Sequence, residues 1–145
     1  KFLGGDNRGA LADYDKALSL NPGLAESWCN RGLLRLLQGS RDLALEDFNR
    51  ALRIRPSYLQ ARINRAVLLI QQEKWSEALE DLDCALSIDP NHAGALANRG
   101  GVFFRQTEWK KAIRDLQSAL DRAPANWADR QAVARMLEEA KKRLR

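Results

Sequence analysis

A short motif, asparagine followed by arginine, occurs three times in this sequence and offers its most distinctive chemistry. The asparagines are Asn30, Asn64 and Asn98, and each motif ends in glycine or alanine. Asparagine is a poor helix former, so its return within helical segments indicates that each side chain has a use. A carboxamide both donates and accepts hydrogen bonds, and it can therefore pair with a peptide unit, with another carboxamide or with water. The residues alone thus leave open whether the series binds a ligand or links helices.

The arginines of these motifs share their spacing with four aspartates. A guanidinium forms strong bidentate hydrogen bonds with a carboxylate, so the shared interval predicts a repeated Arg–Asp bridge between helices. Which repeat supplies the aspartate to each arginine does not follow from the spacing. The two series are Arg31, Arg65 and Arg99, and Asp13, Asp47, Asp81 and Asp115.

The residues of common catalytic and metal sites are scarce. Nucleophilic triads, imidazole acid–base catalysis and most zinc sites need histidine, and the only one is His92, which falls in a turn and is expected to be solvated. The pairs Gly4–Gly5 and Gly100–Gly101 lack the further residues that phosphate-binding and dinucleotide-binding loops require. The sequence therefore predicts a protein that is not an enzyme and that needs no metal or cofactor.

Length, composition and charge are those of a soluble folded domain. The chain has 145 residues, of which 45% are hydrophobic and 30% charged, so it can bury a core. Its longest apolar runs fall far short of the roughly 20 residues that cross a bilayer, and no membrane span is expected. Its 24 basic and 19 acidic residues, with a net charge of +5, are interleaved along the chain, which predicts solvated helix faces and no nucleic-acid partner.

Two local features bear on the location and on a possible anion site. Cys29 and Cys84 lie far apart in a chain that shows no signal peptide, which predicts reduced thiols and a cytoplasmic protein. Basic residues gather at the C-terminal end, where they suit the dipole of a last helix, with binding of phosphate or acidic lipid as the alternative. These basic residues are Lys141, Lys142, Arg143 and Arg145.

All four prolines lie in one register. Pro22, Pro56, Pro90 and Pro124 follow one another at intervals of 34 residues. The same interval relates alanines and leucines, and repetition at a fixed period of this length is the signature of stacked structural repeats. These further series are Ala10, Ala44, Ala78 and Ala112; Ala17, Ala51, Ala85 and Ala119; and Leu18, Leu52, Leu86 and Leu120.

Each repeat contains two helical patterns separated by a short polar break. Apolar residues recur at intervals of three and four, and no alternating strand pattern occurs, so the fold is predicted to be all-α. A proline closes each pair of helices because it lacks the N–H that a continuing helix needs. The predicted pairs are residues 25–38 with 41–54, 59–72 with 75–88, and 93–106 with 109–120; one helix over about 6–20 precedes them and one over about 127–144 follows.

Small residues allow the two helices of each repeat to approach closely. Glycine or alanine recurs at one position of the first helix and one of the second, which suits interaxial distances of about 8–10 Å. The bulky residues of the second helix form an apolar stripe that one hairpin cannot cover, so each repeat needs a neighbour. The small residues are Gly32, Ala66 and Gly100 on first helices, and Ala44, Ala78 and Ala112 on second helices.

The whole chain resembles the tetratricopeptide repeat family. The residues that carry the resemblance in one unit are Trp28, Gly32, Gly39, Ala44, Phe48, Ala51 and Pro56, in the family's signature order and period. Departures are mild, since Arg62 and Leu96 stand where Trp28 stands, and Glu73 and Thr107 replace Gly39. The resemblance implies a right-handed α-solenoid. Its expected parts are the second helix of a truncated repeat (residues 1–24), three repeats (25–58, 59–92 and 93–126) and a capping helix (127–145), all in one domain.

In this family the first helices line a concave groove, and the resemblance places the three asparagines there. In some members asparagines at this position hold the backbone of an extended peptide, which implies a non-catalytic scaffold for an extended peptide or a partner helix. Each such hydrogen bond adds only about 0.5–1.5 kcal/mol, so binding would tolerate many sequences. The expected peptide-binding residues are Asn30, Asn64, Asn98, Leu33, Ile63, Val67, Gln60, Gln71, Phe104 and Arg105.

One subset of the family grips the C-terminal carboxylate of chaperones through lysine and asparagine side chains. Here Cys29 and Leu33 stand where the clamp has lysine and asparagine, and Gly94 stands where it has another lysine. Only Asn64 agrees with the clamp. A chaperone tail is therefore not the expected partner.

Two other roles remain open. The chain could be the interaction arm of a larger enzyme whose catalytic domain lies outside these residues. It could also assemble with itself, because the residues around Lys1 resemble the end of a missing helix that would cover Leu11 and Tyr14. A second copy of the chain would then cover that end.

Overall fold

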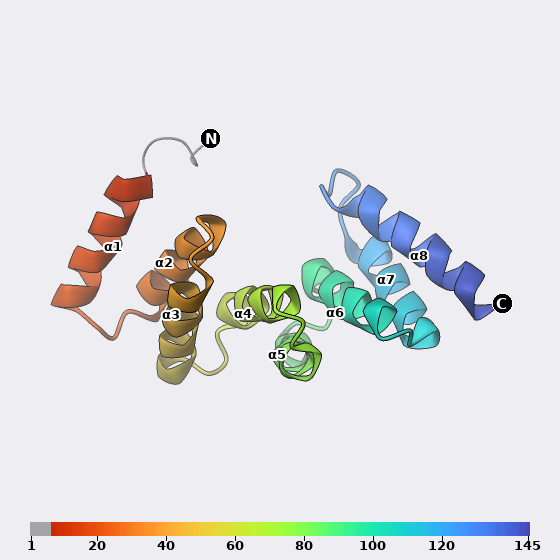
Figure 1. The fold of residues 1–145 in the computed structure, drawn as a ribbon, viewed down its shortest axis with the longest axis horizontal. Coiled ribbons are helices and arrows are strands. Elements are labelled where there is room, and N and C mark those ends of the chain that lie inside the picture. The colour runs from red at the N-terminus through yellow and green to blue at the C-terminus, as the bar shows by residue number, and fades with distance from the viewer. Residues whose placement is uncertain (1–6) are drawn as a thin grey trace. The chain divides into compact units, whose positions relative to one another are not determined.

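The computed structural model describes residues 7–145, and every regular element in this range is an α-helix. Eight helices follow one another through short connections (Figure 1). Their bounds are α1 (Asn7–Leu20), α2 (Ala25–Leu37), α3 (Arg41–Ile54), α4 (Leu59–Gln71), α5 (Trp75–Ile88), α6 (Ala93–Arg105), α7 (Trp109–Arg122) and α8 (Arg130–Leu144).

The predicted helices from residue 25 to 122 agree with the observed ones to within two residues at each end, and the largest difference is at the last helix. The helix expected from about residue 127 begins three residues later, at Arg130. The reason is a turn after Pro124, in which the Trp127 N–H donates to the Pro124 carbonyl at 3.0 Å and the Arg130 N–H donates to the Trp127 carbonyl at 3.2 Å. Asp129 then accepts the first bond of the new helix, from the Val133 N–H. The expected start at about Asp6 and the interpretation of residues 1–3 lie outside the described part.

The break between the two helices of each repeat has a left-handed residue. Gly39 has φ of 86°, and the equivalent residues Glu73 and Thr107 have φ of 58° and 59°. The next residue bonds back into the preceding helix, as when the Ser40 N–H donates to the Arg35 carbonyl at 2.8 Å. Glycine adopts this conformation without steric cost, whereas a side chain with a Cβ does not. All three turns therefore have the same geometry, although in two of them the left-handed residue, Glu73 or Thr107, is unfavourable there.

The helices form two compact units, which we describe separately. One ends at Leu68, within α4, and the other covers Leu69–Arg145. In the first unit α2 packs against both α1 and α3. In the second, α6 packs against α5 and α7, and α8 packs on α7 with a smaller contact to α6 (Figure 1). In each unit the first helix of a repeat therefore contacts the second helices before and after it.

Glycine permits a close helix contact in each unit. A Cβ added to Gly32 would lie 2.8 Å from the Phe48 ring, and one added to Gly100 would lie 2.9 Å from Leu116. Both distances are shorter than a van der Waals contact, so these pairs of helices have no room for a methyl group there. The expectation that small residues mark the helix crossing is confirmed at these two positions.

The core of the first unit is built around Phe48, which is fully buried. Its neighbours come from α2, α3 and α4, and α4 contributes Ala61 and Leu68 to this core. Half-buried side chains then cover the core at its edges. The buried members are Cys29, Ala44, Phe48, Ala51, Leu52, Ala61 and Leu68, and the covering ones are Trp28, Leu36, Leu45 and Tyr58.

Candidate functional site

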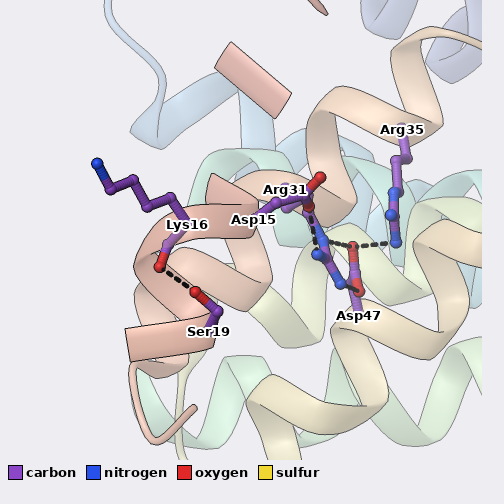
Figure 2. Close-up of polar contacts among 6 residues, drawn as sticks. All are labelled: Asp15, Lys16, Ser19, Arg31, Arg35 and Asp47. Atoms are coloured by element: carbon purple, nitrogen blue, oxygen red, sulfur yellow. Dashed lines mark hydrogen bonds and ion pairs between the residues drawn. The ribbon is translucent and has the colours of Figure 1, made fainter. Parts of the chain in front are cut away.

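The arginine of the first Asn-Arg motif joins three helices of the first unit (Figure 2). The Arg31 guanidinium donates to both carboxylate oxygens of Asp47 on α3, at 2.8 and 3.0 Å. Its remaining nitrogen donates to Asp15 on α1 at 2.6 Å. Arg35, one turn further along α2, donates to Asp47 as well, at 3.0 Å. Because Asp47 is only 1% exposed, this carboxylate depends on the two guanidinium groups for its hydrogen bonds.

The same arrangement occurs in the second unit. Arg99 on α6 donates to both oxygens of Asp115 on α7, at 2.7 and 3.0 Å, and to Asp83 on α5 at 2.9 Å. The predicted Arg–Asp bridge is thus confirmed for Arg31 and Arg99. In both cases the bidentate aspartate follows the arginine by 16 residues, in the second helix of the same repeat.

The sequence reasoning missed the second carboxylate of each bridge. Asp15 and Asp83 precede their arginines by 16 residues and belong to the second helix of the previous repeat. A signal existed, because Asp15, Asn49 and Asp83 lie in one register of 34 residues. At the middle position Arg65 donates to the Asn49 side-chain oxygen at 2.8 Å, so a neutral amide replaces the carboxylate there.

The carboxylates hold these arginines firmly in their charged form. The hydrogen bonds that Arg31 donates to Asp47 raise the pKa of Arg31, with a smaller contribution from the bond to Asp15, although burial opposes the shift. Asp115 and, to a smaller extent, Asp83 raise the pKa of Arg99 in the same way. A raised pKa means that the protonated arginine is the form favoured by folding. The charged form of both arginines, and with it the bridge, therefore persists through neutral and alkaline pH.

Asn64 is the one member of the asparagine series with hydrogen bonds in the structure's described part. It is 7% exposed, donates to the Cys29 sulfur at 3.6 Å and accepts from the Gln60 amide at 3.0 Å. It thereby connects the first helices of consecutive repeats. Burial raises the pKa of the Cys29 thiol, while hydrogen bonds with Tyr58 and Asn64 partly offset that rise. The thiol therefore stays protonated and unreactive at neutral pH.

Asn30 has a different environment. Its side chain is exposed and has no hydrogen-bond partner within residues 7–145. It lies at a cavity of about 130 Å³ in the first unit, together with Tyr14 and Leu33. The other lining residues come from α1 and α2 and are alanine and leucine. The lining is therefore mostly apolar and contains one carboxamide. The full lining is Ala10, Tyr14, Asn30, Leu33, Leu34 and Leu37.

The other predicted groove residues differ in how far their side chains are exposed. In the first unit Ile63 is buried at 5% exposure, Val67 is half-buried and Gln60 is exposed, where it bonds Asn64. In the second unit Asn98 is half-buried without a hydrogen bond to a described residue, and Gln71 is exposed.

Phe104 and Arg105 meet aromatic rings of the second unit. The Phe104 ring lies edge-on to that of Trp109, with 5.2 Å between the ring centroids. The Arg105 guanidinium lies 5.3 Å from the centre of the Trp75 ring. Both side chains therefore pack against aromatic rings within the second unit.

The only histidine has a structural part in the turn before α6. His92 is half-buried, and its Nδ1 accepts a hydrogen bond from the Ala95 N–H at 3.1 Å, which caps the helix. A solvated loop histidine was expected, and the capping bond corrects that expectation. Within residues 7–145 no three metal-ligating side chains gather. No helix in the same range is both long and apolar enough to cross a membrane.

Comparison with known sequences agrees with this repeat architecture. The profile of a family described as "Tetratricopeptide repeat" matches residues 65–140, which is more than half of the chain. This chain belongs to the tetratricopeptide repeat family. A second profile with the same description matches residues 25–58, and one described as "TPR repeat" matches residues 1–39. No curated protein matches this tetratricopeptide chain significantly.

Solved tetratricopeptide structures superpose on the chain. The Sgt2 TPR domain from Aspergillus fumigatus has a TM-score of 0.74 at 22% identity, with 83% of this chain and 78% of that one covered. The first TPR of Spaghetti (RPAP3), described as bound to the HSP90 peptide SRMEEVD, has a TM-score of 0.76 at 21% identity over 83% and 92%. The TPR2B domain of yeast Sti1, described as a complex with pHsp70, has a TM-score of 0.74 at 19% identity over 81% and 96%. This likeness confirms the predicted fold class, an all-α tetratricopeptide solenoid.

Proposed function

We propose that the chain is a non-catalytic protein-interaction module that binds an extended peptide or a partner helix through the first helices of its repeats. Membership of a family whose solved members include peptide complexes supports this role. The observation that carries it is Asn30, an exposed carboxamide that lies beside an apolar cavity and has no hydrogen-bond partner among residues 7–145. The free thiols of Cys29 and Cys84 suit a cytoplasmic location, which is part of the proposal.

Within this proposal the three asparagines contribute unequally. Asn30 and Asn98 are available to pair with the N–H and C=O of a bound peptide. Asn64 already bonds Cys29 and Gln60, so it would contribute mainly by holding the neighbouring helices. Each hydrogen bond to the peptide that is gained this way adds about 0.5–1.5 kcal/mol. Two of them therefore support weak and tolerant binding.

Side chains around the asparagines would add selectivity. We assign an apolar role to Leu33, Ile63, Val67 and Phe104, and a polar one to Gln60, Gln71 and Arg105, as in the expected groove. The small exposed area of Ile63 limits what it can add. We do not propose a chaperone peptide as the ligand of this chain. Cys29, Leu33 and Gly94 lack the charged and polar groups that would hold a terminal carboxylate.

A screen of a peptide array tests the proposal directly. We expect the native chain to bind a subset of peptides, and the Asn30→Ala, Asn98→Ala double variant to lose most of them. Asn126→Ala serves as the matched control, because it removes an exposed carboxamide from a turn. A double variant that melts like the native chain and keeps every hit would remove the asparagines from recognition. The triple variant that adds Asn64→Ala should also lose thermal stability.

Self-assembly is the second candidate, because apolar side chains are exposed near Asn30. Leu33 and Leu37 are 37% and 55% exposed beside Tyr14. Covering them with another copy would remove apolar area from water. Light scattering over a range of concentrations should then show a rising mass that Leu37→Lys abolishes. A constant monomer mass would exclude this candidate.

A further inference from the structure

A second cavity, of about 440 Å³, lies over α3 and the first half of α2. It is separate from the proposed peptide site, since it shares no residue with the expected groove. Its lining is rich in cationic and polar groups and contains one aromatic ring. The lining residues are Trp28, Arg31, Glu46, Asp47, Asn49, Arg50 and Arg53.

Trp28 supplies the aromatic ring that lines this cavity. Its indole N–H donates to the Pro22 carbonyl at 2.8 Å, which holds the ring in place. The Arg50 guanidinium carbon lies 4.9 Å from the ring centre, and that of Arg31 lies 5.0 Å from it. Both distances are within the range of cation–π attraction. Arg50 is therefore ordered by a rigid neighbour although its side chain is exposed.

Two of the three arginines have no counterion in the described part of the chain. Arg31 is neutralised by Asp15 and Asp47. Arg50 and Arg53 are exposed, and neither has a carboxylate at ion-pair distance within residues 7–145. They lie one helical turn apart on α3, and like charges at that spacing repel each other. An anion between them would relieve the repulsion.

The other repeats lack this combination of side chains. Packing does not require the cluster, because α5 and α7 form with small or acidic residues at the positions of Arg50 and Arg53, although Lys16 of α1 matches Arg50. The matching positions hold Cys84 and Ser118 for Arg50, Ser87 and Asp121 for Arg53, and Arg62 and Leu96 for Trp28. A role outside folding therefore accounts for the cluster better than the repeat pattern does.

We propose that this cavity binds a phosphate monoester carried by a peptide, such as a phosphoserine segment of a partner protein. A phosphate monoester has nearly two negative charges and three acceptor oxygens, and guanidinium groups match that geometry through paired N–H bonds. Arg50 and Arg53 would donate to the phosphate oxygens, with Trp28 positioning Arg50. Glu46 and Asp47 also line the cavity and would repel an extended polyanion, so a compact dianion fits better than nucleic acid.

Fluorescence anisotropy with a labelled glycine-serine peptide that contains one phosphoserine tests this site. We expect the native chain to bind this peptide and to bind its unphosphorylated twin at least about tenfold more weakly. Arg50→Ala and Arg53→Ala should each weaken binding by about tenfold or more, and Glu46→Gln should strengthen it several-fold. Arg114→Ala is the matched control, because Arg114 is an exposed arginine on α7 without a described carboxylate partner.

Four results would overturn the proposal. The first is no saturable binding of the phosphopeptide at millimolar protein concentration, and the second is equal loss in Arg114→Ala. The third is inorganic phosphate that competes as strongly as the phosphopeptide, which would leave a free-anion site only. The fourth is a short single-stranded RNA that binds more tightly and with the same dependence on Arg50. Circular dichroism of each variant checks that the helices are intact.

Discussion

Arg31 in the first unit and Arg99 in the second occupy the same place in their repeats, and each bridges two carboxylates. Their surroundings differ. Asp47 receives a further hydrogen bond from Arg35, whereas Phe103 stands at the position equivalent to Arg35, and the Arg99 guanidinium lies 6.0 Å from its ring centre. The buried bridge is thus common to both units, and the residues around it are free to vary. This freedom would allow one repeat to carry the proposed phosphate site without the others sharing it.

Removing the buried carboxylate of each bridge should have the largest effect. Asp47→Ala leaves two partly buried guanidinium groups without their partner, and Asp115→Ala leaves one. We expect each to lower the free energy of unfolding by about 3–5 kcal/mol, with the greater loss in Asp47→Ala. Urea unfolding followed by circular dichroism measures both.

The outer carboxylates supply the control for this comparison. Asp15 and Asp83 are 58% and 63% exposed at the side chain, so their alanine variants should lose less than about 1 kcal/mol. Equal losses from inner and outer aspartates would contradict the assignment of the inner one as the buried anchor.

Adding a methyl group at the glycine contact should have the next largest effect. Gly32→Ala places a Cβ against the Phe48 ring, and overpacking of this kind costs about 1–3 kcal/mol. Gly100→Ala meets Leu116 instead, whose branched side chain can move more easily, so a smaller loss is expected. Thermal melting of the two variants compares the two units directly. A loss in Gly100→Ala larger than that in Gly32→Ala would show that ring rigidity does not set the cost.

The turn residues should respond in opposite directions. Thr107→Gly removes a branched side chain from a left-handed conformation, and it should raise stability by about 0.5–1 kcal/mol after the greater freedom of the unfolded glycine is allowed for. Gly39→Ala should lower stability by a similar amount for the same reason. Differential scanning calorimetry detects both shifts. A destabilised Thr107→Gly variant would mean that another contact of Thr107 matters more than its backbone.

The smallest effect is expected at the middle bridge. Asn49→Asp introduces a carboxylate at the position that Asp15 and Asp83 occupy in other repeats. This carboxylate would lie beside Arg65. We expect a gain of about 0.5 kcal/mol, seen as a rise in Tm of about 1–2 °C. Salt at about 1 M should remove the gain, since the Debye length falls to about 3 Å. A gain that persists in high salt would point to packing and not to charge.

The repeat interval predicted the helices well because it reflects packing that each unit repeats. The prolines, the alanines of the second helices and the glycines at the crossing all mark positions where only a narrow set of residues fits. The start of α8 was misjudged, since nothing in its apolar pattern distinguishes residues 127–129 from a helix. A backbone turn after Pro124 decides that boundary.

The candidate sites were less predictable. The register located the three asparagines, but it could not show that Asn64 bonds Cys29 and Gln60 while Asn30 stays exposed. The cavity of the proposed phosphate site was not predicted, because the combination of residues that lines it does not recur from repeat to repeat. Trp28, Arg50 and Arg53 come from two helices, and each looks like an ordinary surface or signature residue when taken alone.

The sequence by itself determined the period, the all-α class, the family and the pairing of arginine with aspartate, because these follow from spacing within one repeat. Only the tertiary structure decided which aspartates each arginine holds, which asparagine is buried and which guanidinium groups have no carboxylate beside them among the described residues. Those outcomes depend on distances between helices. Such distances come from how side chains of different helices fill a shared core, and no local pattern of residues encodes them separately.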